Sequence, residues 1–149
     1  MTTLDLAIVG AGPAGLAAAR AARRLGLGYV VLERARIAQT IEDYPLDKPL
    51  HSPPQDVELA WGELYSRHRP NATREELLEH YRALAEDEEL EIRSGEEVHA
   101  IERCDAGLRV LGAHRTCEAK RVILATGGFG VPRRLGVPGE IAGDRKSVV

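Results

Sequence analysis

Apolar positions near the N-terminus fall into two short runs with a different pattern between them. Leu4–Val9 (LDLAIV) and Tyr29–Leu32 have the length and composition of buried strands. Between the two runs, the glycine-rich sequence GAGPAG precedes an Ala-, Leu- and Arg-rich stretch that stops at Gly26, which predicts a helix with a glycine end. The pattern therefore predicts a strand–helix–strand unit of about 30 residues.

The pattern then changes, because the segment from Arg36 to Pro70 is rich in proline and has few periodic apolar positions. We expect a long irregular segment with one short helix near Val57–Leu64. Long ordered loops are uncommon in compact domains and are often functional.

Helical periodicity returns at Thr73. The sequence from Thr73 to Glu76 fits a capping box, in which Thr73 caps the helix and Glu76 reaches back to it. The apolar residues that follow share one helical face: Leu77, Leu78, Tyr81, Leu84 and Ala85.

The rest of the pattern alternates with a period of two, interrupted by turn residues, which predicts strands. The expected strands are Glu89–Arg93, Val98–Ile101, Leu108–Leu111, Thr116–Ala119 and a buried Arg121–Thr126. Together they indicate a small antiparallel meander set into an otherwise parallel α/β fold.

Composition narrows the function classes. The 149 residues are 44% apolar and 29% charged with a net charge of −3, which is typical of one globular domain. The Lys and Arg residues are scattered, and no apolar run approaches bilayer length, so we expect neither nucleic acid nor membrane as a partner. The N-terminus has no basic region before its first apolar run, so a cytoplasmic location is expected.

The strongest chemical signal is the first glycine cluster, Gly10-x-Gly12-x-x-Gly15, between the first strand and the first helix. In a dinucleotide-binding unit these glycines allow the tight turn, the approach of a pyrophosphate and close helix packing. Glu33 ends the second strand, where a carboxylate can accept hydrogen bonds from a ribose. A glycine-rich turn without a ligand is the alternative, and the combination of strand, helix and acidic residue favours dinucleotide binding.

A second motif, RVILATGGFGVPRRLGVPGE, contains Ala125-Thr126-Gly127 directly after an apolar run. This resembles the A-T-G motif of flavoproteins with two dinucleotide-binding domains, which implies FAD as the cofactor of the first unit. Essentially the whole chain, including NATREELLEHYRALAE, resembles the thioredoxin-reductase-like FAD-dependent pyridine nucleotide oxidoreductases in their bacillithiol disulfide reductase branch. The implied fold is a three-layer, Rossmann-like FAD-binding domain with a parallel sheet and a small antiparallel β insertion.

The resemblance also implies a set of cofactor-binding residues. Tyr44 and His51 would fall in the segment that approaches the isoalloxazine, although Tyr44 is equally compatible with a packing role and His51 with a surface position. The expected FAD-binding residues are Gly10, Gly12, Pro13, Ala14 and Gly15 at the pyrophosphate, Glu33 and Arg34 at the adenosine ribose, Val98 at the adenine, and Ala125, Thr126 and Gly127 beside the cofactor. No catalytic residue and no metal site is assigned.

Three departures from the family pattern stand out. The chain has no C-x-x-C pair, and Ala14 stands where bacillithiol-type proteins often carry Cys, which puts bacillithiol disulfide in doubt as a substrate. Gly128 directly follows A-T-G, so the aromatic residue expected soon after the motif comes one position later, at Phe129.

Cys104 and Cys117 flank the meander and are expected to be ordinary reduced cysteines, the alternative being a redox pair across a hairpin.

By this resemblance, residues 1–142 form an incomplete FAD-binding domain that lacks its C-terminal return segment. Residues 143–149 would be a linker and the start of an NAD(P)H-binding domain. The implied function is the FAD-binding portion of an NAD(P)H-dependent oxidoreductase acting on a disulfide or other small acceptor, with a homodimer as one assembly open to it. This chain alone is expected to bind FAD weakly and to lack turnover. A flavin-monooxygenase-like domain and a non-catalytic FAD-binding or interaction module are the alternatives.

Overall fold

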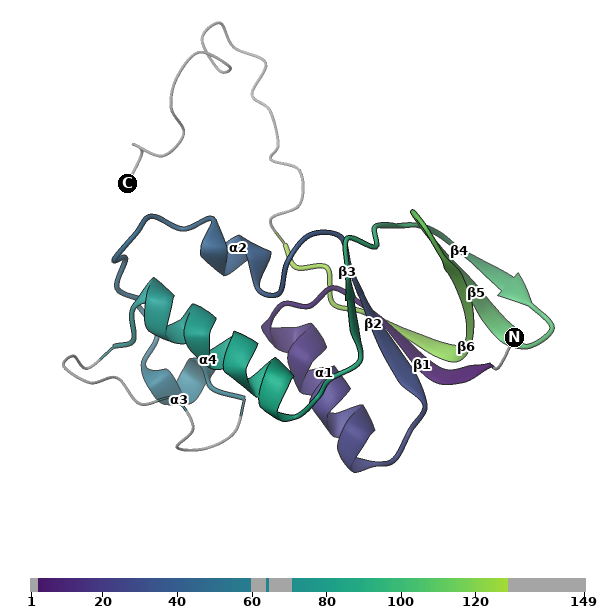
Figure 1. The fold of residues 1–149 in the computed structure, drawn as a ribbon, viewed down its shortest axis with the longest axis horizontal. Helices are drawn as coiled ribbons and strands as arrows, with labels where there is room; N and C mark the ends of the chain where they lie inside the picture. The colour runs from purple at the N-terminus through teal and green to yellow at the C-terminus, as the bar shows by residue number, and fades with distance from the viewer. Residues whose placement is uncertain (1–2, 60–63, 65–70, 129–149) are drawn as a thin grey trace, which may run out of the picture.

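The computed structural model describes residues 3–59, 64 and 71–128, which form a mixed six-stranded sheet with four helices (Figure 1). The strands are β1 (Leu4–Val9), β2 (Tyr29–Glu33), β3 (Ile92–Ser94), β4 (Val98–Cys104), β5 (Gly107–Gly112) and β6 (Thr116–Leu124), in the spatial order β3-β2-β1-β6-β5-β4. The helices are α1 (Pro13–Arg24), α2 (Gln39–Glu42), α3 (Pro54–Val57) and α4 (Arg74–Asp87).

The sheet has a parallel half and an antiparallel half that meet at β6. β1 pairs in parallel with β2 and β6, and β2 pairs in parallel with β3. β6, β5 and β4 form the antiparallel meander. Ala119 of β6 lies opposite both Leu4 of β1 and Leu108 of β5, so one strand belongs to both halves. The expected α/β fold is confirmed. The strand structure predicted at 116–119 and 121–126 is confirmed as far as Leu124, but it forms one continuous strand and not two.

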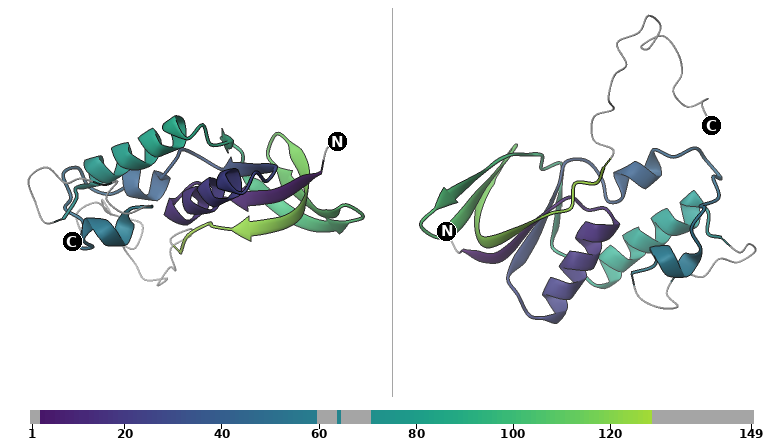
Figure 2. Two further views of the ribbon diagram at one scale, coloured as in Figure 1. Left: turned by 90° about the horizontal axis from the view of Figure 1, so that it is seen from below. Right: turned by 180° about the vertical axis from the view of Figure 1, so that it is seen from behind.

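Successive residues of β1 and β2 point to opposite faces, and each face has its own hydrophobic cluster. Leu6, Ile8 and Val31 face α1 and α4, which lie side by side in Figures 1 and 2. Ala7 and Val30 instead join Val110 of β5. The meander therefore covers the face opposite the helices, which gives the layers helix, parallel sheet and meander.

The burial expected for residues 121–126 is wrong. Ile123 is 39% exposed and Leu124 is 67% exposed. β5 pairs with residues 116–119 of β6, so among the described residues the second half of β6 has a strand neighbour only on its β1 side. Its C-terminal end, at Leu124, instead lines a cleft.

The start of α4 confirms the capping box. Thr73 Oγ1 accepts the backbone N–H of Glu76 at 3.3 Å, and Glu76 Oε2 accepts the N–H of Thr73 at 2.9 Å. At the other end, Glu89 adopts φ +44° and Leu90 donates its N–H to Ala85, which is the hydrogen-bond pattern of a Schellman motif. Leu90 therefore belongs to the cap that follows the helix, and the strand predicted at 89–93 begins only at Ile92.

The described part of the irregular segment holds two short helices, α2 and α3. Glu58 has an extended ψ of 150° directly after α3, and residues 60–63, on which most of the helix expected near Val57–Leu64 falls, lie outside the described part of the chain. Pro54 begins α3, because proline suits the first helical turn. The segment is fixed to the start of α4, since Leu50 donates its N–H to Ala72 at 2.9 Å and Lys48 accepts the N–H of Arg74 at 2.9 Å.

Candidate functional site

A cleft of about 700 Å³ opens at the carboxyl ends of β1, β2 and β6. Ligands of open parallel sheets bind at this edge, outside the ends of the strands. One part of the cleft is formed by the glycine loop after β1, the end of β2 and the residues after β6. The other part is lined by residues 38–41, Tyr44, Lys48, residues 50–52, Val57, and Leu77 and Tyr81 of α4.

Gly10 and Gly15 are required by close backbone contacts. Gly10 adopts φ +104°, and a Cβ there would lie 2.4 Å from the carbonyl oxygen of Ala125. A Cβ on Gly15 would lie 1.8 Å from the carbonyl oxygen of Gly10. Ala125 also donates its N–H to Val9 at 2.8 Å. The loop after β1 is therefore packed directly against the residue that follows β6.

Gly12 differs from both, because a Cβ there would meet nothing within 4 Å. Its φ of −79° and ψ of −174° are open to any residue, so the fold does not demand glycine. α1 begins at the next residue, Pro13, and the amides of a first helical turn lack intrahelical partners. Gly12 thus leaves open space in the cleft directly before a helix N-terminus, a cradle that fits a phosphate group.

Glu33 braces the glycine loop. Its Oε2 accepts the N–H of Ala11 at 2.7 Å and its Oε1 accepts the N–H of Ala35 at 2.9 Å, with the residue only 8% exposed. A carboxylate oxygen can accept a second hydrogen bond, so these contacts leave room for a hydroxyl ligand. Arg34 is exposed beside it and also lines the cleft.

The far part of the cleft combines aromatic and cationic side chains. The Lys48 ammonium lies 5.0 Å from the centroid of the Tyr44 ring, within reach of a cation–π interaction. Burial raises the pKa of Tyr81 to about 12, so its hydroxyl stays protonated and donates to the carbonyl of Val57. Tyr44 and His51 both line this part of the cleft, and their approach to an isoalloxazine stays a prediction.

The model of the pyridine nucleotide-disulphide oxidoreductase family matches residues 7–148. The chain belongs to this family. It is 35% identical over 136 residues to a ferredoxin–NADP reductase of Paraburkholderia phymatum, covering 88% of this chain and 35% of that protein.

Two solved structures are similar to this family member in fold. The bacillithiol disulfide reductase Bdr of Bacillus cereus has a TM-score of 0.86 at 25% identity, over 95% of this chain and 45% of that one. A flavin-containing monooxygenase of Stenotrophomonas maltophilia has a TM-score of 0.77 at 26% identity, over 85% and 38% of the two chains. The chain thus spans less than half the length of each of these relatives.

Most of the predicted cofactor residues of this family member come together in the cleft. Gly15 lies buried beneath the loop, and Val98 packs against the hydrophobic cluster under the meander. Those that line the cleft are Gly10, Gly12, Pro13, Ala14, Glu33, Arg34, Ala125, Thr126 and Gly127. Their roles toward a cofactor, like those of Gly15 and Val98, stay predictions. Phe129 and residues 143–149 lie outside the described part of the chain.

The two cysteines of this family member are free and do not face each other. Cys104 of β4 lies opposite Gly107, whereas Cys117 of β6 lies opposite Val110 on the other side of β5. Two strand spacings separate them, at least about 9 Å, which is too far for a disulfide. Burial raises the pKa of the Cys117 thiol, which disfavours the reactive thiolate.

Within residues 3–59, 64 and 71–128 there is no group of three or more His, Cys, Asp or Glu side chains arranged to hold a metal ion. In the same residues, no helix combines the length and the apolar character needed to cross a bilayer.

Sequence reasoning missed two residues that support the site. Ala38 adopts φ +58° and donates its N–H to the carbonyl of Ala11 at 3.0 Å, a backbone role that an alanine gives no reason to expect. Glu96 is 4% exposed and accepts the N–H groups of His114 at 2.8 Å and Arg115 at 3.0 Å. These bonds hold its pKa below the ordinary value, and its own N–H donates to the carbonyl of Glu33 at 2.8 Å.

Proposed function

We propose that this chain is the FAD-binding portion of an NAD(P)H-dependent flavoprotein oxidoreductase. The observation that carries the proposal is the cradle at Gly12. A loop that packs tightly at Gly10 and Gly15 leaves space at the middle glycine, beside the N-terminus of α1 and within reach of Glu33. A dinucleotide has a pyrophosphate for the cradle and a ribose for the carboxylate.

The roles follow from this placement. The amides at the start of α1 would hold the pyrophosphate, and Glu33 would accept hydroxyls of the adenosine ribose. Ala125, Thr126 and Gly127 would flank the cofactor from the end of β6. When bound, the flavin supplies the redox chemistry, accepting a hydride from a nicotinamide and passing electrons to an acceptor.

The hydride donor and the acceptor belong to a larger protein in this proposal. Residues 1–142 would be the FAD-binding domain, and residues 143–149 would lead to an NAD(P)H-binding domain. The acceptor would be a disulfide or another small molecule. Ala14 lines the cleft and cannot attack a disulfide, so the proposed chemistry uses no thiol from the glycine loop.

A flavin-monooxygenase-like activity is the second candidate, supported by the similarity to the Stenotrophomonas maltophilia monooxygenase. The two candidates differ in their use of oxygen. A monooxygenase needs oxygen to oxidise its substrate, whereas a disulfide reductase turns over anaerobically.

The test of FAD binding is an equilibrium titration of the purified chain with FAD, followed by flavin fluorescence. Saturable binding supports the proposal, and absence of binding up to millimolar FAD contradicts it. FMN is the control, because it lacks the adenosine and the second phosphate.

A second experiment tests turnover. NAD(P)H is added anaerobically to the FAD-loaded chain and to any longer protein that contains it. Bleaching of the flavin band in the longer protein supports the oxidoreductase. No bleaching in either sample supports a non-catalytic FAD-binding module.

A further inference from the structure

The wall of the cleft between the glycine loop and α4 is α2, a helix of four residues. Gln39, Thr40 and Ile41 from this helix line the cleft. A single helical turn is unstable in water by itself, because its few hydrogen bonds do not offset the entropy of ordering it. The position of α2 must therefore be fixed by contacts with its surroundings.

One end of α2 is fixed to the glycine loop. Ala38, directly before the helix, donates its N–H to the carbonyl of Ala11, and Ile41 is buried in the main hydrophobic cluster. Ala38 adopts a left-handed conformation that costs a non-glycine residue on the order of 1 kcal/mol. Such a conformation persists only where the surrounding structure fixes it.

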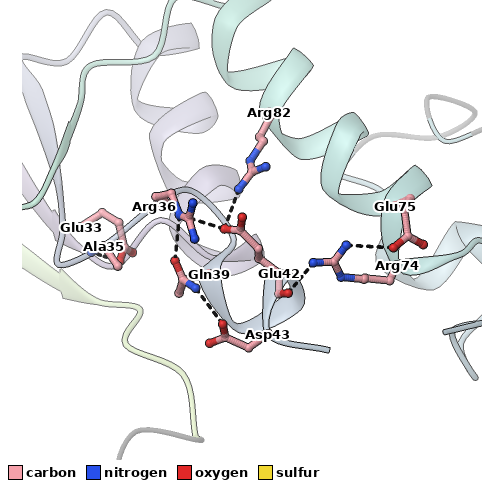
Figure 3. Close-up of polar contacts among 9 residues, drawn as sticks. All are labelled: Glu33, Ala35, Arg36, Gln39, Glu42, Asp43, Arg74, Glu75 and Arg82. Carbon is pink, nitrogen blue, oxygen red and sulfur yellow. Dashed lines mark hydrogen bonds and ion pairs between the residues drawn. The ribbon is translucent and has the colours of Figure 1, made fainter. Parts of the chain in front are cut away.

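The other end of α2 is fixed by Glu42 (Figure 3). Its carboxylate Oε2 lies 2.8 Å from an Arg82 guanidinium nitrogen and 3.1 Å from Nε of Arg36. Its backbone carbonyl accepts a hydrogen bond from Arg74 of α4. The Glu42 side chain is only 18% exposed, so it is less screened than a fully exposed ion pair.

The same cluster holds the side chain of Gln39, one of the residues that line the cleft. Gln39 Oε1 accepts a hydrogen bond from Nε of Arg36 at 3.4 Å, and Gln39 Nε2 donates to Asp43 Oδ1 at 2.8 Å (Figure 3). Glu42 thus acts on the cleft along two routes. It joins α2 to α4 through Arg82, and it fixes Arg36, which in turn contacts Gln39.

From this geometry we infer that Glu42 is a positioning residue for the bound dinucleotide: it joins α2 to α4 and so sets the wall of the cleft without lining the cleft itself. The inference rests on the proposed FAD binding. Without the carboxylate, the Arg36 and Arg82 guanidiniums lose the anion between them. α2 then keeps its inner anchor and the hydrogen bond from Arg74 to the Glu42 carbonyl, and the ligand has to order more of the wall when it binds.

The test is FAD titration of Glu42→Gln, which keeps the size of the side chain and the backbone carbonyl but removes the charge. We expect about fivefold weaker binding, the scale of one lost ion pair. Glu86→Gln, an exposed glutamate on α4, is the matched control and should bind like the wild type. Arg82→Lys keeps the charge and should stay within about twofold, whereas Arg82→Gln should weaken binding.

A double-mutant cycle and hydrogen exchange separate positioning from general destabilisation. Combining Glu42→Gln with Arg82→Gln should weaken binding no more than Glu42→Gln alone, because both remove one interaction. In the ligand-free protein, Glu42→Gln should speed amide exchange in residues 38–43 and leave α1 and β1 unchanged.

The outcomes distinguish a failure of the proposed FAD binding from a failure of the positioning role of Glu42. If the wild type does not bind FAD, the proposed function fails. If the wild type binds and Glu42→Gln binds within twofold of it, the positioning role is wrong. It is equally wrong if the two losses add in full, or if exchange rises across the whole sheet.

Discussion

At the scale of single residues, the three glycines of the loop do different work. Gly10 and Gly15 serve the fold, because any side chain would collide with backbone atoms. Gly12 serves the cleft, because a side chain there would point into open space. One motif thus contains separable requirements for folding and for binding, and substitutions can distinguish them.

Gly12→Ala should fold with wild-type stability within about 0.5 kcal/mol and bind FAD at least about tenfold more weakly, since a methyl group would occupy the cradle. Gly15→Ala should instead destabilise the protein by about 2 kcal/mol or more, because its Cβ would overlap the Gly10 carbonyl. Urea unfolding and FAD titration measure the two effects. A stable Gly12→Ala protein with unchanged affinity for FAD would contradict the proposed role of the cradle at Gly12 in binding a phosphate.

Glu33→Gln should weaken FAD binding by about tenfold, since a charge-assisted acceptor becomes a neutral one. It should also destabilise the ligand-free protein by about 1–2 kcal/mol, because the N–H groups of Ala11 and Ala35 lose part of their acceptor. Cys104→Ala, far from the cleft on β4, is the control for the titration. Equal effects of the two substitutions on affinity would show that the site is misplaced.

At the scale of elements, an acidic side chain, that of Glu96, stabilises the turn between two strands by hydrogen bonds. Glu96, between β3 and β4, accepts hydrogen bonds from the turn between β5 and β6, at His114 and Arg115, which lie 18 and 19 residues further along the chain. Gly112 permits this contact, since a Cβ there would lie 2.2 Å from Glu96 Oε1.

Glu96 predicts a pH dependence of stability. Its pKa is lowered by the N–H groups of His114 and Arg115, so its contribution is present above its ordinary value of 4.5 and is lost as the pH falls through the lower folded-state value. Glu96→Gln should therefore lower the melting temperature at pH 7, and the gap to the wild type should narrow below pH 4.5. The exposed Glu97→Gln is the control. A gap that stays constant with pH would contradict the assignment.

Thr73→Ala should destabilise the protein by about 1 kcal/mol, because Glu76 loses its capping acceptor at the start of α4. Chemical denaturation measures the change. Glu79→Ala, on the exposed face of the same helix, should stay within about 0.5 kcal/mol. A Thr73→Ala protein as stable as the wild type would mean that the capping box adds nothing.

Local signals in the sequence predicted elements well where chemistry and periodicity agreed. The capping box at Thr73 and the strand–helix–strand unit around Gly12 are examples. Leu90 was wrongly assigned to a strand, because a leucine in the cap after a helix and a leucine in a strand look alike in an alternating pattern. Ala38 and Glu42 could not be found, because their importance depends on contacts with Ala11 and Arg82 that only the tertiary structure creates.

At the scale of the whole molecule, the site is assembled from segments far apart in the sequence. The loop after β1, the end of β2, α2, α4 and the end of β6 all border one cleft. A ligand that fills it binds only the folded chain, so binding adds to the stability of the entire domain.

FAD at a hundredfold excess over its dissociation constant should therefore stabilise the wild type by about 2.7 kcal/mol. Thermal unfolding with and without FAD measures the gain. The Gly12→Ala protein at the same FAD concentration should gain much less. An identical gain in both proteins would place FAD outside this cleft.

The contact between Gly10 and Ala125 also dictates an order of events during synthesis. The loop after β1 is among the first segments to leave the ribosome. The Ala125 carbonyl that packs against Gly10, and the strand β6 that pairs with β1, are made more than a hundred residues later. Pairing across such a separation is slow, because a long loop must close first. A nascent chain stopped before Ala125 should therefore hold the complete GxGxxG sequence and still be unable to retain a dinucleotide.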